Sequence, residues 1–257
     1  GLGKDISSKE MISFWQKEHI NTDFVFKFND LKPGSYKIET DELGERNFSY
    51  DRSKAAARYI FDHPDIIKLE KSIYKFQYIF LSGISIAILP TKDRAKLTKL
   101  LKKYKEKGGQ VVFDNNYREQ LWTSSDEAKL WFNQILPICT IYMLSYDDEI
   151  NVYGKHSLND CVTRVKAMGV SEIIIKRGAK SCFVSFEGDI TENELNPVSR
   201  VIDSTAAGDS FNAGYLASRL AGESIKKSIS AGHELASTVI GYPGAIIPIE
   251  AMPELAT

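Results

Sequence analysis

One stretch of the chain, residues 201–214, combines residue types that suit phosphoryl transfer. It reads Val-Ile-Asp-Ser-Thr-Ala-Ala-Gly-Asp-Ser-Phe-Asn-Ala-Gly. The β-branched pair Val201 and Ile202 predicts the end of a strand, the small residues predict a tight turn, and the apolar spacing from Phe211 onward predicts a helix. The first N–H groups of such a helix have no partner within it, and the helix dipole adds positive charge. The turn is therefore a candidate anion site.

Asp209 places a carboxylate in this same turn. Beside a bound phosphate, a carboxylate can act as the general base that removes the proton of an attacking hydroxyl. Asp209 could instead only cap the helix, because aspartate is common at that position. For a single aspartate, spacing alone does not separate the two interpretations.

The composition is typical of a soluble globular protein, with 43% hydrophobic and 26% charged residues in a chain of 257. A net charge of −1 gives no basic field for nucleic acid or a membrane surface. No apolar run approaches the ~20 residues of a membrane span, and there is no signal-peptide pattern, so we expect a cytoplasmic protein. The three cysteines are widely spaced and fit buried thiols better than disulfides or a zinc site.

Residues 23–52 alternate in the manner of strands. Apolar or aromatic residues recur at every second position in 24–28, 36–40 and 48–52, with turn residues between these runs. Three short antiparallel strands without helices predict a small separate sheet, a β-lid. Its third strand would send Tyr50 and Arg52 to the same face.

From about residue 55 onward, strand and helix patterns alternate, which predicts an α/β fold with a mainly parallel sheet flanked by helices. The chain itself opens on an amphipathic helix that Ser7 or Ser8 can cap. The expected strands are 78–81, 111–113, 141–144, 173–175 and 183–186, and the expected helices are 92–107, 126–136, 159–168, 211–220 and 225–240.

Ligands of open α/β sheets lie beyond the carboxyl ends of the strands, so polar residues there are the next candidates. Arg118 could bind a carboxylate or phosphate, or be an ordinary solvated arginine. A carboxylate in the run 146–149, Tyr-Asp-Asp-Glu, could organise Mg²⁺ through waters, although an acidic helix N-terminus explains this run as well. The run 176–179, Lys-Arg-Gly-Ala, could approach nucleotide phosphates through its backbone. We expect His233, in an apolar helical stretch, to pack.

Taken together, these segments resemble the ribokinase-like (PfkB) family of carbohydrate kinases. The motif Asp-x-Thr-Ala-Ala-Gly-Asp-x-x-x-Ala-Gly is similar to the family's long C-terminal signature, and the similarity extends over essentially the whole chain. The other similar segments are 81–89, 113–118, 176–179 and 244–248. The resemblance implies a Rossmann-like ribokinase fold, with residues 1–22 and 53–257 as the kinase domain and 23–52 as the inserted β-lid.

The resemblance also implies ATP-dependent phosphorylation of a 2-keto-3-deoxy sugar acid to its 6-phosphate, with Mg²⁺ and K⁺ as candidate ions. Asp209 would be the base, and Ala206, Ala207 and Gly208 would offer backbone N–H groups to the transferring phosphoryl. Two arginines facing the cleft would match the carboxylate of a sugar acid better than a neutral sugar. The other implied contacts are Tyr36, Tyr50, Arg52, Arg118 and Asp209 for the sugar acid, Lys176, Arg177, Gly178, Ala206 and Gly208 for the nucleotide, Glu149 for Mg²⁺, and Asp203 and Thr205 for a monovalent cation.

The chain departs from the family pattern in three places. Tyr146 stands where the family's Asn-x-x-Glu motif has its asparagine, which leaves Glu149, and the usual Thr-x-Gly-x-x-Gly loop reads Lys-Arg-Gly-Ala-Lys-Ser. The family's first strand and its Gly-Gly-Asp/Asn loop are absent, so we expect the natural protein to be longer at its N-terminus. Another ribokinase-like sugar or nucleoside kinase, or a binding protein that has lost catalysis, remains an alternative. The lid is a candidate surface for homo-oligomers.

Overall fold

The computed structural model describes residues 1–40, 46–51, 54–193, 198 and 200–254. The chain divides into two compact units, one of residues 1–79 with 84–110 and one of residues 80–83 with 111–257. Within the described ranges, no helix is long and apolar enough to cross a bilayer.

The first unit opens on helix α1 (Ile6–Lys17), and its cap is not the predicted serine. Asp5 is the N-cap, because its carboxylate accepts hydrogen bonds from both the backbone N–H and the hydroxyl of Ser8, at 3.1 and 2.7 Å. Ser8 is therefore a donor in the first turn of the helix. The unit's other elements are β1 (Ser35–Thr40), β2 (Arg46–Asp51), α2 (Ile66–Ser72) and α4 (Thr91–Glu106), with α3 (Gly83–Ala87) starting at its boundary.

The predicted lid has two strands in the structure, not three. β1 and β2 pair antiparallel, with Tyr36 opposite Tyr50. Residues 24–28 form no strand, only an isolated bridge from Lys27 to Leu2. The aromatic alternation there serves packing, since Phe26 is buried and stacks on His63 with ring centres 4.9 Å apart.

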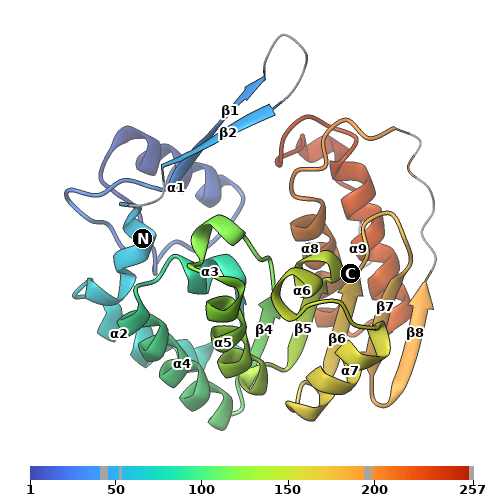
Figure 1. Ribbon diagram of the computed structural model, residues 1–257. Helices are drawn as coiled ribbons and strands as arrows, with labels where there is room; N and C mark the ends of the chain where they lie inside the picture. The colour runs from blue at the N-terminus through green and yellow to red at the C-terminus, as the bar shows by residue number, and fades with distance from the viewer. Residues whose placement is uncertain (41–45, 52–53, 194–197, 199, 255–257) are drawn as a thin grey trace. The chain divides into compact units, whose positions relative to one another are not determined.

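The sheet confirms the predicted α/β class. In the described part of the chain it has six strands in the order β3-β4-β5-β6-β7-β8, of which Figure 1 labels β4 to β8. β4, β5 and β6 run parallel, β7 pairs antiparallel with β6, and β8 pairs antiparallel with β7. Their central residues are buried, as expected of strands covered on both faces. The bounds are β3 (Tyr78–Ser82), β4 (Gln110–Asp114), β5 (Ile141–Ser145), β6 (Glu172–Lys176), β7 (Cys182–Phe186) and β8 (Asp189–Asn193).

Among the helices of the second unit, α5, α7 and α9 lie within one residue of the predicted ranges, whereas α8 begins four residues before its predicted start and α6 is a helix outside the predicted ranges. Two of them, α8 and α9, lie side by side (Figure 1), and a Cβ added at Gly214 would be 2.6 Å from the Ala231 carbonyl oxygen. Only glycine permits that approach. His233 on α9 packs edge-on against Phe211, as expected, and burial lowers its pKa to about 4. The bounds are α5 (Ser125–Ile135), α6 (Tyr146–Tyr153), α7 (Leu158–Ala167), α8 (Ala207–Leu220) and α9 (Ile225–Val239).

Val201 and Ile202, where a strand is predicted to end, lie in no strand among the described residues. Both residues are exposed, and the Ile202 N–H donates to the carbonyl of Ile240 at the end of α9, at 2.8 Å. The turn before α8 is thus entered from a loop that is held to α9. β-Branched residues favour strands only where a neighbouring strand offers them a packed surface, and none pairs with them here among the described residues.

Candidate active site

Three polar side chains from different elements meet at the carboxyl ends of β4 and β6. Asn212 on α8 donates from Nδ2 to Asp114 Oδ2 at 2.7 Å, and Lys176 Nζ donates to Asn212 Oδ1 at 2.9 Å. Lys176 Nζ also lies 3.5 Å from Asp114 Oδ1. Because Asp114 is only 3% exposed, its charge needs these partners. Sequence reasoning missed Asp114 and Asn212, which lie 98 positions apart.

The turn before α8 adds free backbone donors beside this cluster. Ala206 has a φ of +62°, a left-handed conformation that residues with a Cβ seldom adopt and that occurs at functional turns. The N–H groups of Ala206 and Gly208 have no acceptor within the described residues, whereas the Ala207 N–H donates to the Ser204 carbonyl at 3.3 Å. A Cβ on Gly208 would be 3.8 Å from Lys176 Nζ, so the ammonium lies next to the turn. Free N–H groups and a cation together suit a phosphate.

Asp209 is the third residue of α8 and is accessible to solvent. Partial burial of its carboxyl group raises its pKa above that of an ordinary aspartate, and the nearby Asp114 raises it further, whereas Lys176 and Arg118 lower it. Since the residue as a whole is exposed, water screens part of these effects. A carboxylate with a raised pKa is a stronger base once it is ionised.

A second carboxylate, Asp148, lies within the same electrostatic neighbourhood. Its Oδ2 accepts the backbone N–H of Tyr117 at 3.2 Å and lies 3.8 Å from a guanidinium nitrogen of Arg118. Burial raises the pKa of Asp148 and Arg118 lowers it. The nearby Asp114 raises this pKa as well, whereas Lys176 lowers it. Arg118 also lines a polar cavity of about 530 Å³, which Asp209 and Lys176 do not line.

Glu149, predicted to organise Mg²⁺, faces another direction. It is fully buried, accepts a hydrogen bond from the Tyr142 hydroxyl at 2.9 Å and pairs with Arg164. Consecutive helical residues point about 100° apart, so the neighbours Asp148 and Glu149 on α6 cannot share a site. The direction of each side chain depends on where α6 begins, at Tyr146, which the structure supplies.

At the end of β6 it is the Lys176 side chain that joins the cluster, and the predicted backbone contact of this segment with nucleotide phosphates stays a prediction. The Arg177 guanidinium turns back to the Ser181 carbonyl at 2.8 Å and to Glu192 at 2.9 Å. Gly178 has a φ of +59°, which favours glycine. Lys176, which was expected to act through its backbone, places its ammonium in the cluster described above.

The residues predicted for a monovalent cation shape the turn themselves. Asp203 Oδ1 accepts hydrogen bonds from the Thr205 N–H at 2.9 Å and from the Thr205 hydroxyl at 2.7 Å. Its other oxygen accepts the Gly244 N–H at 3.0 Å. Of the predicted lid contacts, Tyr36 and Tyr50 belong to the first unit, and Arg52 lies outside the described residues.

The family model described as pfkB family carbohydrate kinase matches residues 1–252. The 2-dehydro-3-deoxygluconokinase of Dickeya dadantii is 45% identical over 256 residues, which cover 98% of this chain and 82% of that protein. The same-named enzyme of Escherichia coli K12 is 44% identical with the same coverage. A crystal structure of a candidate ribokinase II from E. coli, in complex with ATP and Mg²⁺, superposes with a TM-score of 0.80 at 19% identity, covering 98% of this chain and 78% of that one.

Proposed function

The chain belongs to the pfkB family of carbohydrate kinases, and from this premise we propose that it transfers the γ-phosphoryl group of ATP to 2-dehydro-3-deoxygluconate, also called 2-keto-3-deoxygluconate, to give the 6-phosphate. One observation carries the proposal at the level of residues. Asp209 stands at a turn where free N–H groups and the Lys176 ammonium together suit a transferring phosphoryl.

In this mechanism the Asp209 carboxylate takes the proton of the sugar hydroxyl as its oxygen attacks the γ-phosphorus. The bond from that phosphorus to the β,γ-bridging oxygen breaks, and ADP leaves with the electron pair. The N–H groups of Ala206 and Gly208 and the ammonium of Lys176 meet the negative charge on the phosphoryl oxygens. Asn212 and Asp114 hold Lys176 in place.

The donor set fits Mg²⁺, which prefers oxygen ligands and binds through one or two carboxylates together with substrate phosphates. We assign its organisation to Asp148, because Asp148 lies near Asp114 and Lys176 whereas the described partners of Glu149 include neither. Bound Mg²⁺ would neutralise phosphate charge. Asp203 and Thr205 remain our candidates for a monovalent cation.

The substrate is tested by a phosphoryl-transfer assay on the purified chain with 2-dehydro-3-deoxygluconate, fructose, ribose and a nucleoside. We expect kcat/KM to be highest for the sugar acid. A neutral sugar or nucleoside preferred over the acid would favour another ribokinase-like kinase. ATP binding without turnover of any of these acceptors would favour the binding protein that has lost catalysis.

Replacing Asp148 by asparagine should raise the Mg²⁺ concentration needed for half-maximal activity by about tenfold, the usual scale for residues that orient a metal. Glu149→Gln is the matched control, since it changes the next carboxylate along the same helix. This control should lower stability, because it leaves Arg164 without its charge partner, but keep the Mg²⁺ requirement. If Mg²⁺ titrations show a higher Mg²⁺ requirement for Glu149→Gln and an unchanged one for Asp148→Asn, Glu149 is the residue that organises Mg²⁺.

A further inference from the structure

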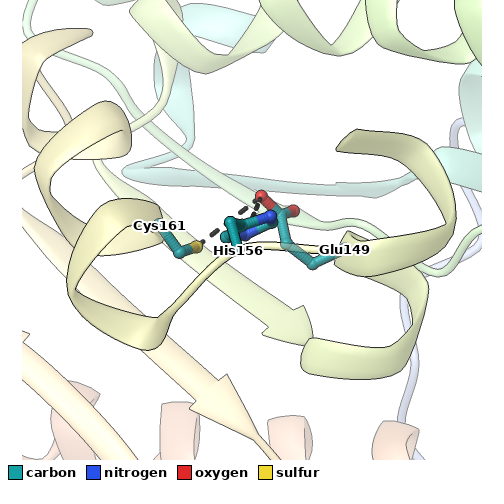
Figure 2. A group of neighbouring side chains, drawn as sticks. All are labelled: Glu149, His156 and Cys161. Atoms are coloured by element: carbon teal, nitrogen blue, oxygen red, sulfur yellow. Dashed lines mark hydrogen bonds and ion pairs between the residues drawn. The ribbon is translucent and has the colours of Figure 1, made fainter. Parts of the chain in front are cut away.

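A second group of metal-binding side chains lies around Glu149. Figure 2 shows Glu149 on α6, His156 in the segment between α6 and α7, and Cys161 on α7, with their side chains directed at one another. Their ligand atoms all lie within 4.8 Å of one another. Glu149 and Cys161 are fully buried, and the His156 side chain is 16% exposed. The phosphoryl-transfer mechanism uses none of the three.

The hydrogen bonds of His156 leave one ring nitrogen free. Its Nδ1 lies 2.7 Å from the Gly154 carbonyl, which can only accept, so Nδ1 carries the proton. Nε2 is buried and has no hydrogen-bond partner among the described residues, and it lies 3.9 Å from Glu149 Oε1. In the neutral ring, the Nε2 lone pair therefore faces a carboxylate oxygen. A buried lone pair beside a carboxylate is a place that a cation can occupy, and in this structure the cation paired with that carboxylate oxygen is the Arg164 guanidinium.

The distances from Glu149 Oε1 to the other two ligand atoms are compatible with a metal ion of the zinc type. Ligands bound tetrahedrally at about 2.0–2.3 Å lie roughly 3.3–3.7 Å from one another. The Cys161 thiol donates a hydrogen bond to Glu149 Oε1 at 3.6 Å, a separation that a shared metal ion would also give, and His156 Nε2 lies 3.9 Å from the same oxygen, slightly beyond this range. One carboxylate, one imidazole and one thiol form a donor set that zinc accepts and that Mg²⁺ does not.

The segment that carries His156 is held in position before any ion binds. The Tyr146 hydroxyl donates to the backbone carbonyl of His156, and the two rings pack edge to face. Ser157 and Asp160 then form a capping box that fixes the start of α7. Because the neighbours of His156 are fixed on both sides, its ring would lose little conformational freedom on binding a metal.

We propose that Glu149, His156 and Cys161 form a binding site for a divalent transition metal such as Zn²⁺, separate from the Mg²⁺ of phosphoryl transfer. The three cysteines are free and buried, as the sequence predicts, and the proposal adds metal binding to the role of Cys161. The metal would tie α6 to α7, and so would fix the helix on which Asp148 stands.

Arg164 is the competitor of the metal. Its guanidinium pairs with Glu149 Oε1 and stacks on the Tyr153 ring at 3.7 Å. Its side chain is 26% exposed, so it can withdraw toward solvent when an ion takes its place. Burial raises the pKa of the Cys161 thiol to about 12, so the thiol must release its proton to solvent when its sulfur binds the metal.

The test uses Co²⁺ as a probe on the 257-residue chain after treatment with a chelator. We expect one thiolate-bound, tetrahedral Co²⁺ per chain, seen as a sulfur-to-cobalt charge-transfer band and strong visible bands. Cys161→Ser should abolish the charge-transfer band, and His156→Gln should weaken binding at least about tenfold. The controls Cys182→Ser, at another buried thiol, and His19→Gln, at an exposed histidine, should leave binding unchanged.

Arg164→Gln provides a variant that gains binding. Removing the competing cation should tighten Co²⁺ binding at least about tenfold, and Zn²⁺ should then raise the Tm of this variant more than that of the wild type. The proposal is overturned if neither the wild type nor Arg164→Gln shows a thiolate band, or if the band survives in Cys161→Ser. In that case Glu149 is neutralised by Arg164, as in this structure, and the cluster binds no metal.

Discussion

Replacing Asp209 by asparagine should lower kcat at least about 100-fold, because the attacking hydroxyl loses its general base while the turn that meets the phosphate stays intact. ATP binding should be nearly unchanged, since the neighbouring donors, Lys176 and the N–H groups of Ala206 and Gly208, remain. Asp147→Asn is the matched control, because it removes one exposed carboxylate from α6 without touching this turn. A variant at position 209 with near wild-type kcat would show that Asp209 is not the base.

The same substitution should not destabilise the protein. The pKa of Asp209 is raised in the folded state, chiefly by burial, so the folded chain holds this proton more tightly than the unfolded chain. Stability is then lost as pH rises from the unfolded pKa through the folded one, and asparagine avoids that loss. We expect Asp209→Asn to be at least as stable as the wild type at neutral pH in urea unfolding. Activity should fall as the pH is lowered through the pKa of Asp209, above that of an ordinary aspartate.

Burial patterns explain why most of the fold could be predicted from sequence. The strands 111–113, 141–144 and 173–175 are apolar runs bounded by turn residues, and the structure adds only one or two residues at their ends. The two wrongly predicted strands come from residues whose strand-like pattern has another cause. Phe26 alternates with its aromatic neighbours in order to pack on His63, and Val201 and Ile202 are exposed in a loop.

The site was predictable only where one local segment carries it. The turn around Asp209 is contiguous, so its motif is visible in the sequence. The contact of Lys176 with Asp114 and Asn212 joins three segments, and no local spacing shows which strand ends face one another. Likewise, the choice between Asp148 and Glu149 depends on which way each residue points from a helix whose first residue is known only from the structure.

Arg118→Ala should weaken the use of a sugar acid far more than that of its neutral carboxamide. A charge-assisted hydrogen bond contributes about 1.5–3 kcal/mol, which corresponds to a loss of roughly 10- to 150-fold in kcat/KM for the acid. The Arg118 side chain is 48% exposed, lines the polar cavity and lies within electrostatic reach of Asp209, so it can meet a carboxylate while the hydroxyl reacts. Arg52 is predicted to act in the same way.

Because Arg118 also lies near Asp148, replacing it by alanine removes both the proposed contact with the substrate carboxylate and the positive charge beside Asp148. The variant Arg118→Lys separates these two effects, since lysine keeps the positive charge but cannot bind a carboxylate through two parallel hydrogen bonds. We expect the lysine variant to keep the wild-type Mg²⁺ requirement and still lose part of the preference for the acid. Equal losses for the acid and the carboxamide in the alanine variant would mean that Arg118 supports Asp148 and does not recognise the substrate's charge. The ratio of the two kcat/KM values, measured at saturating Mg²⁺, therefore decides whether this residue confers specificity for sugar acids.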